Sequence, residues 1–384
     1  MKHVFIIGSK GIPARYGGFE TFVENLTKRK VNPTIQYHVA CQGEEEQEFE
    51  YNGARCFQVK LKKLGSAKAV CYDLESLQKC LDYIEEHKIE APIIYILACR
   101  IGPFLKFYQR KLRPMNGRIY VNVDGHEWKR SKWNRWIKAY WKVSERLMVK
   151  YADLVVCDAR AIQEYVKQEY HRYGPRTVYL SYGTDLGPAG IGLDAEKAAA
   201  WYSRNHLKAQ EYYLVVGRFV PENNYEIIIR EFMNSNTTKD LVFITNLEQN
   251  KFYRRLLAST GFTRDSRLKF VGTVYDQGLL KKIREDSFAY IHGHEVGGTN
   301  PSLLEALAAT PLNLLLDVSF NREAGADGAV YFNKAPGSLA KLIAEVETYP
   351  PSRILELARR AQKRVRDNYS WEKIVGEYEE LFLS

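Results

Sequence analysis

Apolar runs and amphipathic stretches alternate along the whole chain, which predicts strands separated by helices. Several runs are continuously apolar, as parallel strands buried on both faces are. The predicted strands of the first half span residues 3–9, 35–41, 54–61, 92–98, 118–124, 153–158 and 177–182. Those of the second half span residues 212–216, 241–245, 268–271, 288–292 and 312–316. Amphipathic segments such as 73–87 and 161–170 predict crossover helices, so the expected architecture is α/β with doubly wound parallel sheets.

The chain has 384 residues, more than one ordinary α/β domain needs and enough for two. Residues 186–207 begin with a run rich in glycine and are interpreted as a linker with a short helix. The predicted domains are therefore residues 1–185 and residues 186–368. The second domain ends with a predicted helix over 352–368, and a last amphipathic helix follows it.

The composition is that of a globular protein with a basic surface. Apolar residues make up 45% and charged residues 27%, and no run approaches the ~20 apolar residues that span a bilayer. The first residues lead quickly into a strand and a glycine, unlike a signal peptide, so a cytoplasmic protein is expected. The six cysteines are scattered without a Cys-x-x-Cys pair, as buried thiols in a reducing compartment are. The net charge of +10 indicates a polyanionic partner: nucleic acid, anionic lipid or a phosphorylated substrate.

Candidate chemistry is expected just after the strands, because open parallel sheets bind ligands at the carboxyl ends of their strands. The first such segment, residues 8–21, is a loop with four glycines that leads into a helix near Phe19. Glycines let backbone N–H groups approach a phosphate, and Lys10 and Arg15 favour anion binding over the alternative of a tight turn. The spacing is neither G-x-G-x-x-G nor a P-loop, which weakens the dehydrogenase and nucleotide-hydrolase interpretations.

A second segment, residues 293–307, combines glycines with the start of a helix. Pro301 suits a first helical turn, with Asn300 or Thr299 as its N-cap. Glu305 follows about one turn later, where a carboxylate can accept hydrogen bonds from sugar hydroxyls while the N-terminal N–H groups face phosphate. The alternative is a solvated helix residue, which the apolar neighbours of Glu305 disfavour.

Two further segments each centre on one polar side chain. Arg218 directly follows the predicted strand 212–216 and can bind a diphosphate through two hydrogen bonds, unless it forms only a surface ion pair. His126 lies in residues 124–130, again after a strand, where it can contact a donor sugar or phosphate. A single histidine is more often structural, so its position alone leaves both roles open.

Taken together, these segments resemble the family-4 retaining glycosyltransferases of the GT-B fold. The most specific stretches are residues 7–21, 124–130, 217–224 and 292–305, and residues 369–374 also fit. The resemblance covers nearly the whole chain. Within the family, the sequence is most similar to the bacterial β-1,4-rhamnosyltransferase branch that builds cell-wall and capsular polysaccharides. It implies two Rossmann-like domains that face each other across a cleft. Residues 1–185 would bind the acceptor and residues 186–368 the nucleotide sugar, with a last helix, 369–384, that returns to the first domain.

The resemblance also implies roles for single residues. Glu305 matches the second glutamate of the family's E-x7-E motif, which holds the nucleotide ribose, and Arg218 matches the arginine on the donor diphosphate. The expected catalytic residues are Asp124, His126 and Glu295. The expected donor nucleotide and diphosphate site consists of Arg218, Asn223, Gly298, Thr299, Asn300, Ser302 and Glu305. The expected phosphate and acceptor loop contributes Lys10, Arg15, Gly17, Gly18 and Glu20.

Two positions depart from the family pattern. The first glutamate of E-x7-E falls on Gly297, and Glu295 is the candidate substitute. The lysine that the family places five residues after the arginine is Asn223 here. The diphosphate is then expected to be neutralised by Arg218 and backbone N–H groups, with Lys10 or Arg130 as further candidates.

The implied reaction transfers L-rhamnose from dTDP-β-L-rhamnose to a sugar acceptor, often carried on a polyprenyl diphosphate lipid, with retention at the anomeric carbon. No carboxylate pair stands out as nucleophile and acid, so front-face attack is expected, in which the leaving diphosphate takes the acceptor proton. The protein would mainly position the substrates and stabilise charge, and no metal or other cofactor is expected. UDP-linked N-acetylglucosamine or glucose is the alternative donor.

Residues 128–150 predict an amphipathic helix with a basic stripe. Its expected apolar face comprises Trp133, Trp136, Ile137, Tyr140, Trp141, Leu147 and Met148. Its expected basic stripe comprises Arg135, Lys138, Lys142, Arg146 and Lys150, which Lys106, Arg110, Lys111 and Arg113 would extend. Tryptophan beside lysine and arginine is typical of a helix on an anionic membrane, and a core helix with a solvated basic face is the alternative. The protein is therefore expected at the cytoplasmic face of the membrane.

Three other classes of protein share some of these sequence features. A nucleic-acid-binding protein would explain the charge, but no recognition motif is visible, and no nucleic-acid partner is expected. A nicotinamide dehydrogenase lacks its fingerprint and the acidic residue after the second strand. A non-catalytic sugar-binding module stays open because of the two departures.

Overall fold

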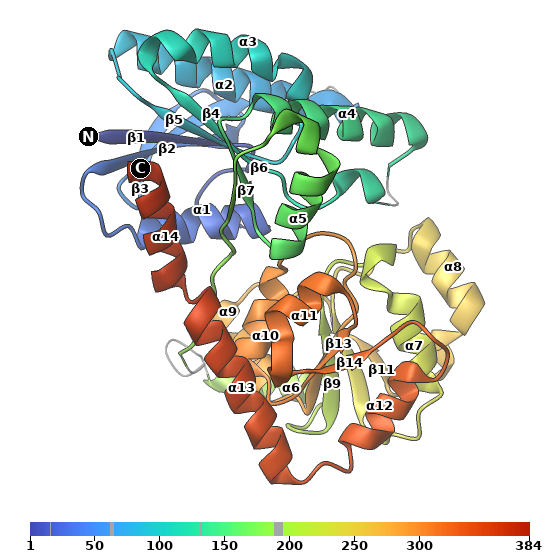
Figure 1. Ribbon diagram of the computed structural model, residues 1–384. Helices are drawn as coiled ribbons and strands as arrows, with labels where there is room; N and C mark the ends of the chain where they lie inside the picture. Colours follow the sequence, from blue (N-terminus) through green and yellow to red (C-terminus); the bar gives the residue numbers. More distant parts are fainter. Residues whose placement is uncertain (16, 62–64, 131–132, 188–194) are drawn as a thin grey trace. The chain divides into compact units, whose positions relative to one another are not determined.

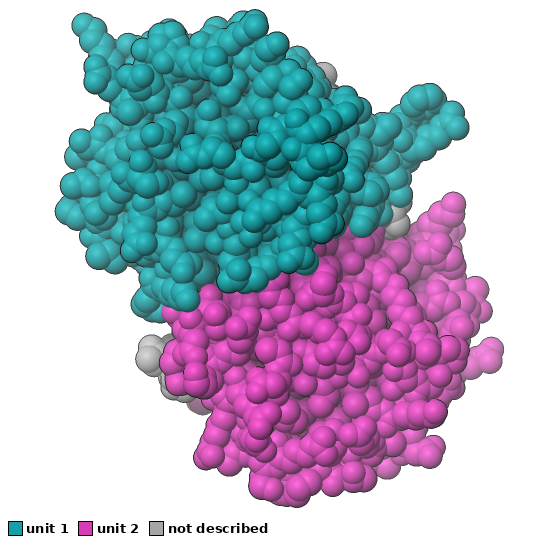
Figure 2. All heavy atoms as spheres, in the orientation of Figure 1, with its two compact units in different colours: residues 1–183, 371–384 teal, residues 184–370 magenta. Residues whose placement is uncertain are grey.

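The computed structural model describes residues 1–15, 17–61, 65–130, 133–187 and 195–384. The chain forms two compact units, residues 1–183 with 371–384 (unit 1) and residues 184–370 (unit 2), which Figure 2 colours separately. Each unit has its own mostly parallel sheet covered by helices, so the expected α/β, doubly wound architecture is confirmed. Of the predicted linker and short helix over 186–207, residues 188–194 lie outside the described residues, and residues Ala195–Asn205 form a helix.

The sheet of unit 1 contains eight strands in the order β3-β4-β2-β1-β5-β6-β7-β8 (Figure 1). Their bounds are β1 Lys2–Ile7, β2 Ile35–Gly43, β3 Glu48–Tyr51, β4 Ala54–Lys60, β5 Ile93–Leu97, β6 Arg118–Asn122, β7 Leu154–Cys157 and β8 Thr177–Tyr179. All pairs are parallel except β3 with β4. The short polar edge strand β3 was not predicted, because its sequence, Glu-Phe-Glu-Tyr, lacks the apolar run that marks the buried strands.

The described residues of unit 1 also form the α-helices α1 Gly18–Lys28, α2 Lys68–Glu86, α3 Gly102–Leu112, α4 Arg135–Tyr151, α5 Arg160–Glu169 and α14 Trp371–Leu383. Helices α2 and α3 lie on one side of the sheet, and α1 and α14 lie together on the other (Figure 1). Helix α3 was not predicted. The predicted helix over 128–150 starts later than expected, because Asn134 caps α4 by accepting from the N–H groups of Trp136 and Ile137.

Unit 2 has a six-stranded parallel sheet in the order β11-β10-β9-β12-β13-β14. Its strands are β9 Tyr212–Val216, β10 Asp240–Ile244, β11 Leu268–Phe270, β12 Ala289–His292, β13 Asn313–Leu316 and β14 Val330–Phe332. Its helices are α6 Ala195–Asn205, α7 Tyr225–Met233, α8 Lys251–Thr260, α9 Gln277–Glu285, α10 Pro301–Ala309, α11 Ser319–Gly325, α12 Ser338–Val346 and α13 Pro351–Tyr369. The three-residue strand β14 was missed, since so short a run gives no periodicity to detect.

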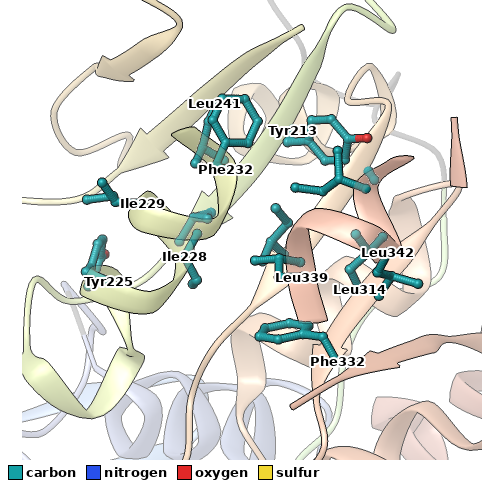
Figure 3. Close-up of a cluster of buried hydrophobic side chains, with 14 of the residues drawn as sticks. Tyr213, Tyr225, Ile228, Ile229, Phe232, Leu241, Leu314, Phe332, Leu339 and Leu342 are labelled. Carbon is teal, nitrogen blue, oxygen red and sulfur yellow. The ribbon is translucent and has the colours of Figure 1, made fainter. Parts of the chain in front are cut away.

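The core of unit 2 is built where α7 and α12 cover the sheet (Figure 3). Tyr213 of β9 packs edge-on against Phe232 of α7, with ring centroids 5.9 Å apart. Phe243 and Phe270, on neighbouring strands, stack at 4.5 Å. Tyr213, Phe232 and Phe243 are fully buried, and aromatic rings of this size bury more apolar area than most side chains, so they fix how the helices lie on the sheet.

The chain passes into and out of unit 2 at neighbouring residues. The N–H of Thr184 donates to the carbonyl of Tyr369 at 2.8 Å, and Thr184 forms an isolated parallel bridge with Ser370. On the unit 1 side, a Cβ on Gly183 would lie 2.4 Å from the indole of Trp371, so only glycine fits there. Unit 2 is therefore inserted between β8 and α14 of unit 1.

Helix α14 is tied into unit 1 by polar and aromatic contacts. The hydroxyl of Tyr378 lies 3.1 Å from that of Tyr95 on β5, and the ring of Phe382 contacts Tyr95 and Tyr120. The carboxylate of Glu379 accepts from the N–H groups of Val31 at 2.8 Å and Asn32 at 3.0 Å. The last helix of the chain thus holds the loop between α1 and β2.

We expect Glu379→Ala to lower the free energy of unfolding by about 2 kcal/mol, because two charge-assisted hydrogen bonds are lost at a site that is 5% exposed. Urea unfolding followed by circular dichroism measures the change. The exposed neighbour Glu380→Ala is the matched control and should leave the stability within about 0.5 kcal/mol of the original. Equal effects of the two substitutions would contradict the proposed anchoring.

Candidate functional site

The glycine loop after β1 packs closely against β2 and β5, the two strands that flank β1 in the sheet. Gly8 has a φ of +94°, and a Cβ there would lie 2.2 Å from the carbonyl oxygen of Leu97 on β5. Gly11 has a φ of +95°, and a Cβ there would lie 2.4 Å from the sulfur of Cys41 on β2. Both positions require glycine for conformation and for space. These two glycines therefore have a packing role whatever the loop binds.

Two backbone N–H groups of this loop, both candidates for phosphate binding from the sequence, form hydrogen bonds within the loop. The N–H of Lys10 donates to Glu20 Oε1 at 2.6 Å, and the N–H of Gly11 donates to the hydroxyl of Ser9 at 3.2 Å. A Cβ on Gly17 would lie 1.9 Å from Glu20 Oε2, so Gly17 makes room for this carboxylate. Glu20 is buried and shapes the loop from inside.

The cationic side chains of the loop remain on the surface. Lys10 and Arg15 are exposed. Gly18 is the first residue of α1, whose opening N–H groups cannot bond within the helix and leave a partial positive charge at this end. The loop therefore presents its positive charge outward, while its carboxylate is turned in.

The expected catalytic residue Asp124 follows β6 in a left-handed conformation, with a φ of +53°. Its N–H donates to Asn122 Oδ1 at 2.8 Å, and Oδ2 lies 4.0 Å from Arg130 Nη2. Arg130 also pairs with Glu127. Burial raises the pKa of Asp124 and the charge of Arg130 opposes that rise. The segment is thus a folded ion-pair cluster at the carboxyl end of the sheet.

His126 is held among aromatic rings. Its ring centroid lies 4.3 Å from that of Tyr165 and 5.8 Å from that of Trp128. Burial, followed by the charges of Lys129 and Lys142, lowers the pKa of His126 to about 4. The imidazole is therefore neutral at physiological pH, where it can donate or accept a hydrogen bond but cannot neutralise a diphosphate.

Lys142 does not belong to a surface stripe, contrary to the sequence prediction. Its Nζ donates to the hydroxyl of Tyr165 at 2.6 Å, pairs with Glu169 at 2.8 Å and lies 4.7 Å from the centre of the Trp128 ring. Tyr165 in turn donates to the buried Glu145 at 2.6 Å. This lysine belongs to the packing behind His126, because the turn of α4 that carries it faces α5.

The other predicted membrane residues divide between surface and interior. Trp133 precedes the helix, and its indole N–H donates to Glu127 at 3.0 Å, so its predicted place on the helix was wrong. Trp136 is 71% exposed with Arg135 stacked on it, while Lys138 and Trp141 are half-buried. Met148, predicted on the same apolar face, is fully buried.

In unit 2, the loops after β9 and β12 are joined by hydrogen bonds. Asn223 Nδ2 donates to the carbonyl of Arg218 at 2.7 Å, and Asn223 Oδ1 lies 2.8 Å from His294 Nδ1. Asn224 Nδ2 donates to the carbonyl of Gly293 at 2.8 Å. Asn223 therefore links two loops, and the Arg218 side chain stays exposed beside them.

Helix α10 begins directly after this junction. Of the two N-cap candidates, Asn300 caps the helix by accepting from the N–H of Ser302 at 2.9 Å, and Pro301 occupies the first turn as predicted. Gly298 and Thr299 are buried ahead of the cap. The hydroxyl of Ser302 lies 3.3 Å from that of Tyr290 on β12, which fixes the first turn of the helix on the sheet.

Glu305 forms an ion pair that the sequence did not reveal. Its Oε2 lies 2.5 Å from Arg284 Nη2, and the same nitrogen donates to the hydroxyl of Ser302 at 3.2 Å. The Arg284 side chain is 3% exposed and that of Glu305 is 33% exposed. Arg284 lies among Lys281 and Lys282 in an amphipathic helix, so nothing in its sequence context distinguished it from a solvated cation. The pair holds Glu305 in place while leaving part of its carboxylate accessible.

Glu295, the proposed substitute for the missing glutamate, pairs with Lys334. Its N–H donates to the carbonyl of Glu222 at 3.1 Å, which adds another link between the loops after β9 and β12. Among the described residues, no group of three or more His, Cys, Asp or Glu side chains is placed to hold a metal ion.

Comparisons with known proteins bear on the fold. A protein family described as a domain of unknown function, DUF1972, matches residues 1–185, and no curated protein matches the sequence. A sucrose-phosphate synthase from Thermosynechococcus elongatus is 15% identical with a TM-score of 0.78, over 100% of this chain and 98% of that chain. Anabaena HepE, solved with UDP and glucose, is 14% identical with a TM-score of 0.71 over 100% of both chains. A structure titled trehalose-6-phosphate from E. coli, bound with UDP-2-fluoro glucose, is 12% identical with a TM-score of 0.74 over 100% of this chain and 99% of that chain. The chain therefore shares the GT-B fold of these solved structures.

Proposed function

We propose that this protein is a retaining glycosyltransferase that moves L-rhamnose from dTDP-β-L-rhamnose to a sugar acceptor on a polyprenyl diphosphate lipid, in cell-wall or capsular polysaccharide synthesis. The observation that carries the transferase proposal is the junction in unit 2, where the loops after β9 and β12 meet Arg218, the start of α10 and the restrained Glu305. The structural neighbours solved with UDP support a nucleotide-sugar donor. The choice of rhamnose and of the lipid-linked acceptor rests on the sequence resemblance.

The junction offers complementary groups to a nucleoside diphosphate. The opening N–H groups of α10 and the guanidinium of Arg218 suit the diphosphate. The accessible part of the Glu305 carboxylate suits hydroxyl groups of the nucleotide sugar. Because Asn223 is uncharged and already bonded to Arg218 and His294, it does not replace the family's lysine as a cation. Arg218 is then the main side-chain charge on the donor diphosphate.

In the proposed reaction the acceptor hydroxyl oxygen bonds to the anomeric carbon on the face from which the diphosphate departs. The bond from that carbon to the diphosphate oxygen breaks, and the acceptor proton passes to this oxygen. The protein positions the partners and stabilises the developing charge, and no metal or cofactor takes part. In unit 1, neutral His126 would hold a substrate hydroxyl, and Asp124 would orient polar groups of the same substrate. In unit 2, Glu295 would orient polar groups of the donor.

A UDP-sugar is the second candidate donor, favoured by the UDP complexes among the structural neighbours. Thermal-shift screening against dTDP- and UDP-sugars separates the two, because a ligand present at 100 times its Kd stabilises the folded state by about 2.7 kcal/mol. We expect the largest shift with dTDP-β-L-rhamnose, and NMR of the product should show a retained anomeric configuration. An inverted product would refute the mechanism, and binding without turnover would favour a non-catalytic sugar-binding module.

We expect Glu305→Gln to abolish most of the donor-induced shift while keeping the protein folded, because an amide can still accept from Arg284. Glu305→Ala should in addition lower the free energy of unfolding by about 3 kcal/mol, since it leaves the buried Arg284 charge unpaired. The double variant Arg284→Met with Glu305→Gln should regain part of that stability. Urea unfolding with and without the donor measures both effects, and an unchanged donor shift in Glu305→Gln would exclude this residue from the site.

We further propose that unit 1 docks on an anionic membrane through α3 and the start of α4. No helix in the described part of the chain combines the length and the apolarity needed to cross a bilayer. The exposed side chains of α3 include Phe104 and Phe107 together with Lys106, Arg110 and Lys111. Trp136 of α4 is also exposed, and the two helices are in contact through Gly102 and Ser144. Exposed aromatic rings among lysine and arginine suit the interface of an anionic bilayer.

We expect the triple variant Phe104→Ser, Phe107→Ser, Trp136→Ser to lose at least about tenfold in affinity for vesicles of phosphatidylglycerol at low salt, since three apolar anchors are removed. Sedimentation with vesicles measures the affinity. Leu355→Ser, which removes an apolar side chain of similar exposure from α13 in unit 2, should bind like the original protein. If the original protein ignores these vesicles, membrane docking is refuted.

A further inference from the structure

Each sheet has one place where its strand order reverses. In unit 1, β1 is followed in the chain by β2 on one side, whereas β5 pairs with β1 on the other side. In unit 2, β9 pairs with β10 on one side and with β12 on the other. Ligands of doubly wound sheets bind at such a reversal, beyond the carboxyl ends of the two strands. The candidate donor residues occupy the reversal in unit 2, so the reversal in unit 1 is the natural second site.

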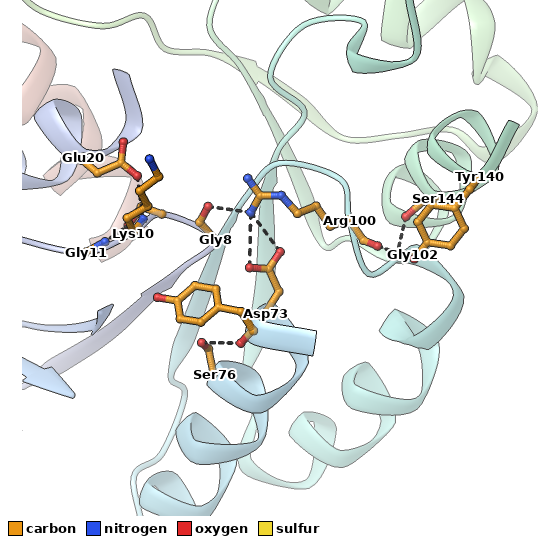
Figure 4. Close-up of polar contacts among 12 residues, drawn as sticks. Gly8, Lys10, Gly11, Glu20, Asp73, Ser76, Arg100, Gly102, Tyr140 and Ser144 are labelled. Carbon is orange, nitrogen blue, oxygen red and sulfur yellow. Dashed lines mark hydrogen bonds and ion pairs between the residues drawn. The ribbon is translucent and has the colours of Figure 1, made fainter. Parts of the chain in front are cut away.

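Arg100 lies at the reversal in unit 1 (Figure 4). It follows β5 and reaches across to the loop after β1, where its Nη1 donates to the carbonyl of Gly8 at 2.8 Å. The same nitrogen lies 3.1 Å from Oδ2 of Asp73 on α2. On the other side, the backbone carbonyl of Arg100 accepts from the hydroxyl of Tyr140 at 2.7 Å. The guanidinium is therefore fixed on the crevice between the two loops.

The rest of the guanidinium is available to a ligand. Arginine carries five N–H donors, and the contacts of Arg100 to Gly8 and Asp73 use only those on Nη1. Within the described residues, neither Nε nor Nη2 of Arg100 has a hydrogen-bond partner. The side chain is 21% exposed, whereas that of Asp73 is fully buried. The Nη1 end of the guanidinium thus bonds to Gly8 and Asp73, whereas the edge with Nε and Nη2 is open.

The charges around Arg100 favour an anion at this open edge. Burial alone would lower the pKa of Arg100, but Asp73, followed by Asp124 and Glu127, raises it, so the group stays charged. Lys10 and Arg15 are exposed on the loop that Arg100 contacts, and α3 begins two residues after Arg100 with its positive N-terminal end. The carboxylates of Asp124 and Glu127 are paired with Arg130, which limits their repulsion of an anion.

We propose that the open edge of Arg100 binds a phosphate group of the acceptor substrate at the strand-order reversal of unit 1. The guanidinium edge offers two parallel N–H donors, the geometry that matches two oxygens of one phosphate. The assignment of this phosphate to the acceptor rests on the proposed function, whereas the binding of phosphate does not. Asp73 acts as the positioning residue that holds the guanidinium in place.

The test measures pyrophosphate binding by calorimetry to the full-length chain carrying Arg218→Gln, so that the donor site does not compete. Arg100→Gln alone would leave the Asp73 carboxylate buried without its partner, so the test variant pairs Arg100→Gln with Asp73→Asn. Asp73→Asn alone keeps Arg100 and is the matched variant. Arg110→Gln, which removes an exposed cation from α3, controls for net charge.

We expect the Arg110→Gln protein to bind pyrophosphate within about threefold of the parent. The Asp73→Asn protein should bind more weakly than the parent, because Asp73 positions the guanidinium. The Arg100→Gln/Asp73→Asn protein should lose at least about a further tenfold, as loss of a bidentate charged contact predicts. Equal binding by the Arg100→Gln/Asp73→Asn and Asp73→Asn proteins would overturn the proposal, as would a parent that does not bind pyrophosphate. Circular dichroism and thermal unfolding verify that each variant is folded.

Two further ligands separate the sources of the phosphate. Farnesyl diphosphate represents a lipid-linked acceptor, and glucose 6-phosphate represents a soluble sugar phosphate. Arg100-dependent binding of the first and not the second would support a lipid-linked acceptor, and the reverse would support a soluble one. Because nucleotide-sugar binding is measured at Arg218 and Glu305, failure of the donor proposal and failure of this one give different results.

Discussion

The reversal of strand order beside the first strand of each sheet is the constraint on which the rest of this molecule depends. At a reversal, the loops that leave two adjacent strands turn to opposite faces of the sheet, so a crevice opens between them. In unit 2 the walls of the crevice are the loops after β9 and β12, and in unit 1 they are the loops after β1 and β5. The polar residues discussed above matter because they lie at these walls.

Both crevices use the same device, a buried charged pair with one accessible partner. Arg284 is almost fully buried and presents Glu305, whereas Asp73 is fully buried and presents Arg100. Burying an ion pair is costly in itself, so such pairs are weak contributors to stability. Their benefit is a charged group whose position is set before a ligand arrives, which reduces the ordering that binding requires. The two pairs have opposite polarity and so suit different parts of a substrate.

The sequence was sufficient for the architecture and for the position of the glycine-rich loops after β1 and β12, because continuous apolar runs and glycine-rich loops are local signals. The start of α10 at Pro301 and the approximate bounds of the long strands followed from such signals. Arg284 and Arg100 could not be found in this way, since their roles depend on partners 21 and 27 residues away in the chain (Arg284 to Glu305 and Arg100 to Asp73). Lys142 was misassigned for the same reason: its helix faces an aromatic cluster that periodicity cannot show.

Glu20 and Asn223 illustrate a second limit of inference from sequence. Each lies in a segment with the composition of a binding loop, and each is engaged by the backbone of that loop. A polar side chain next to a glycine can form hydrogen bonds with a ligand or with the backbone N–H and carbonyl groups that the glycine leaves accessible. Close backbone approach favours the second choice, so such residues shape a site more often than they touch its occupant.

The chain enters unit 2 at Thr184 and leaves it at Ser370, and these two residues form a backbone bridge. Unit 2 is therefore an inserted domain whose two ends are adjacent. A short linker could join the two ends without distorting the fold. New termini could then be opened in a surface loop, which would give a circular permutant of unit 2. Unit 2 is thereby open to exchange between proteins that share this topology.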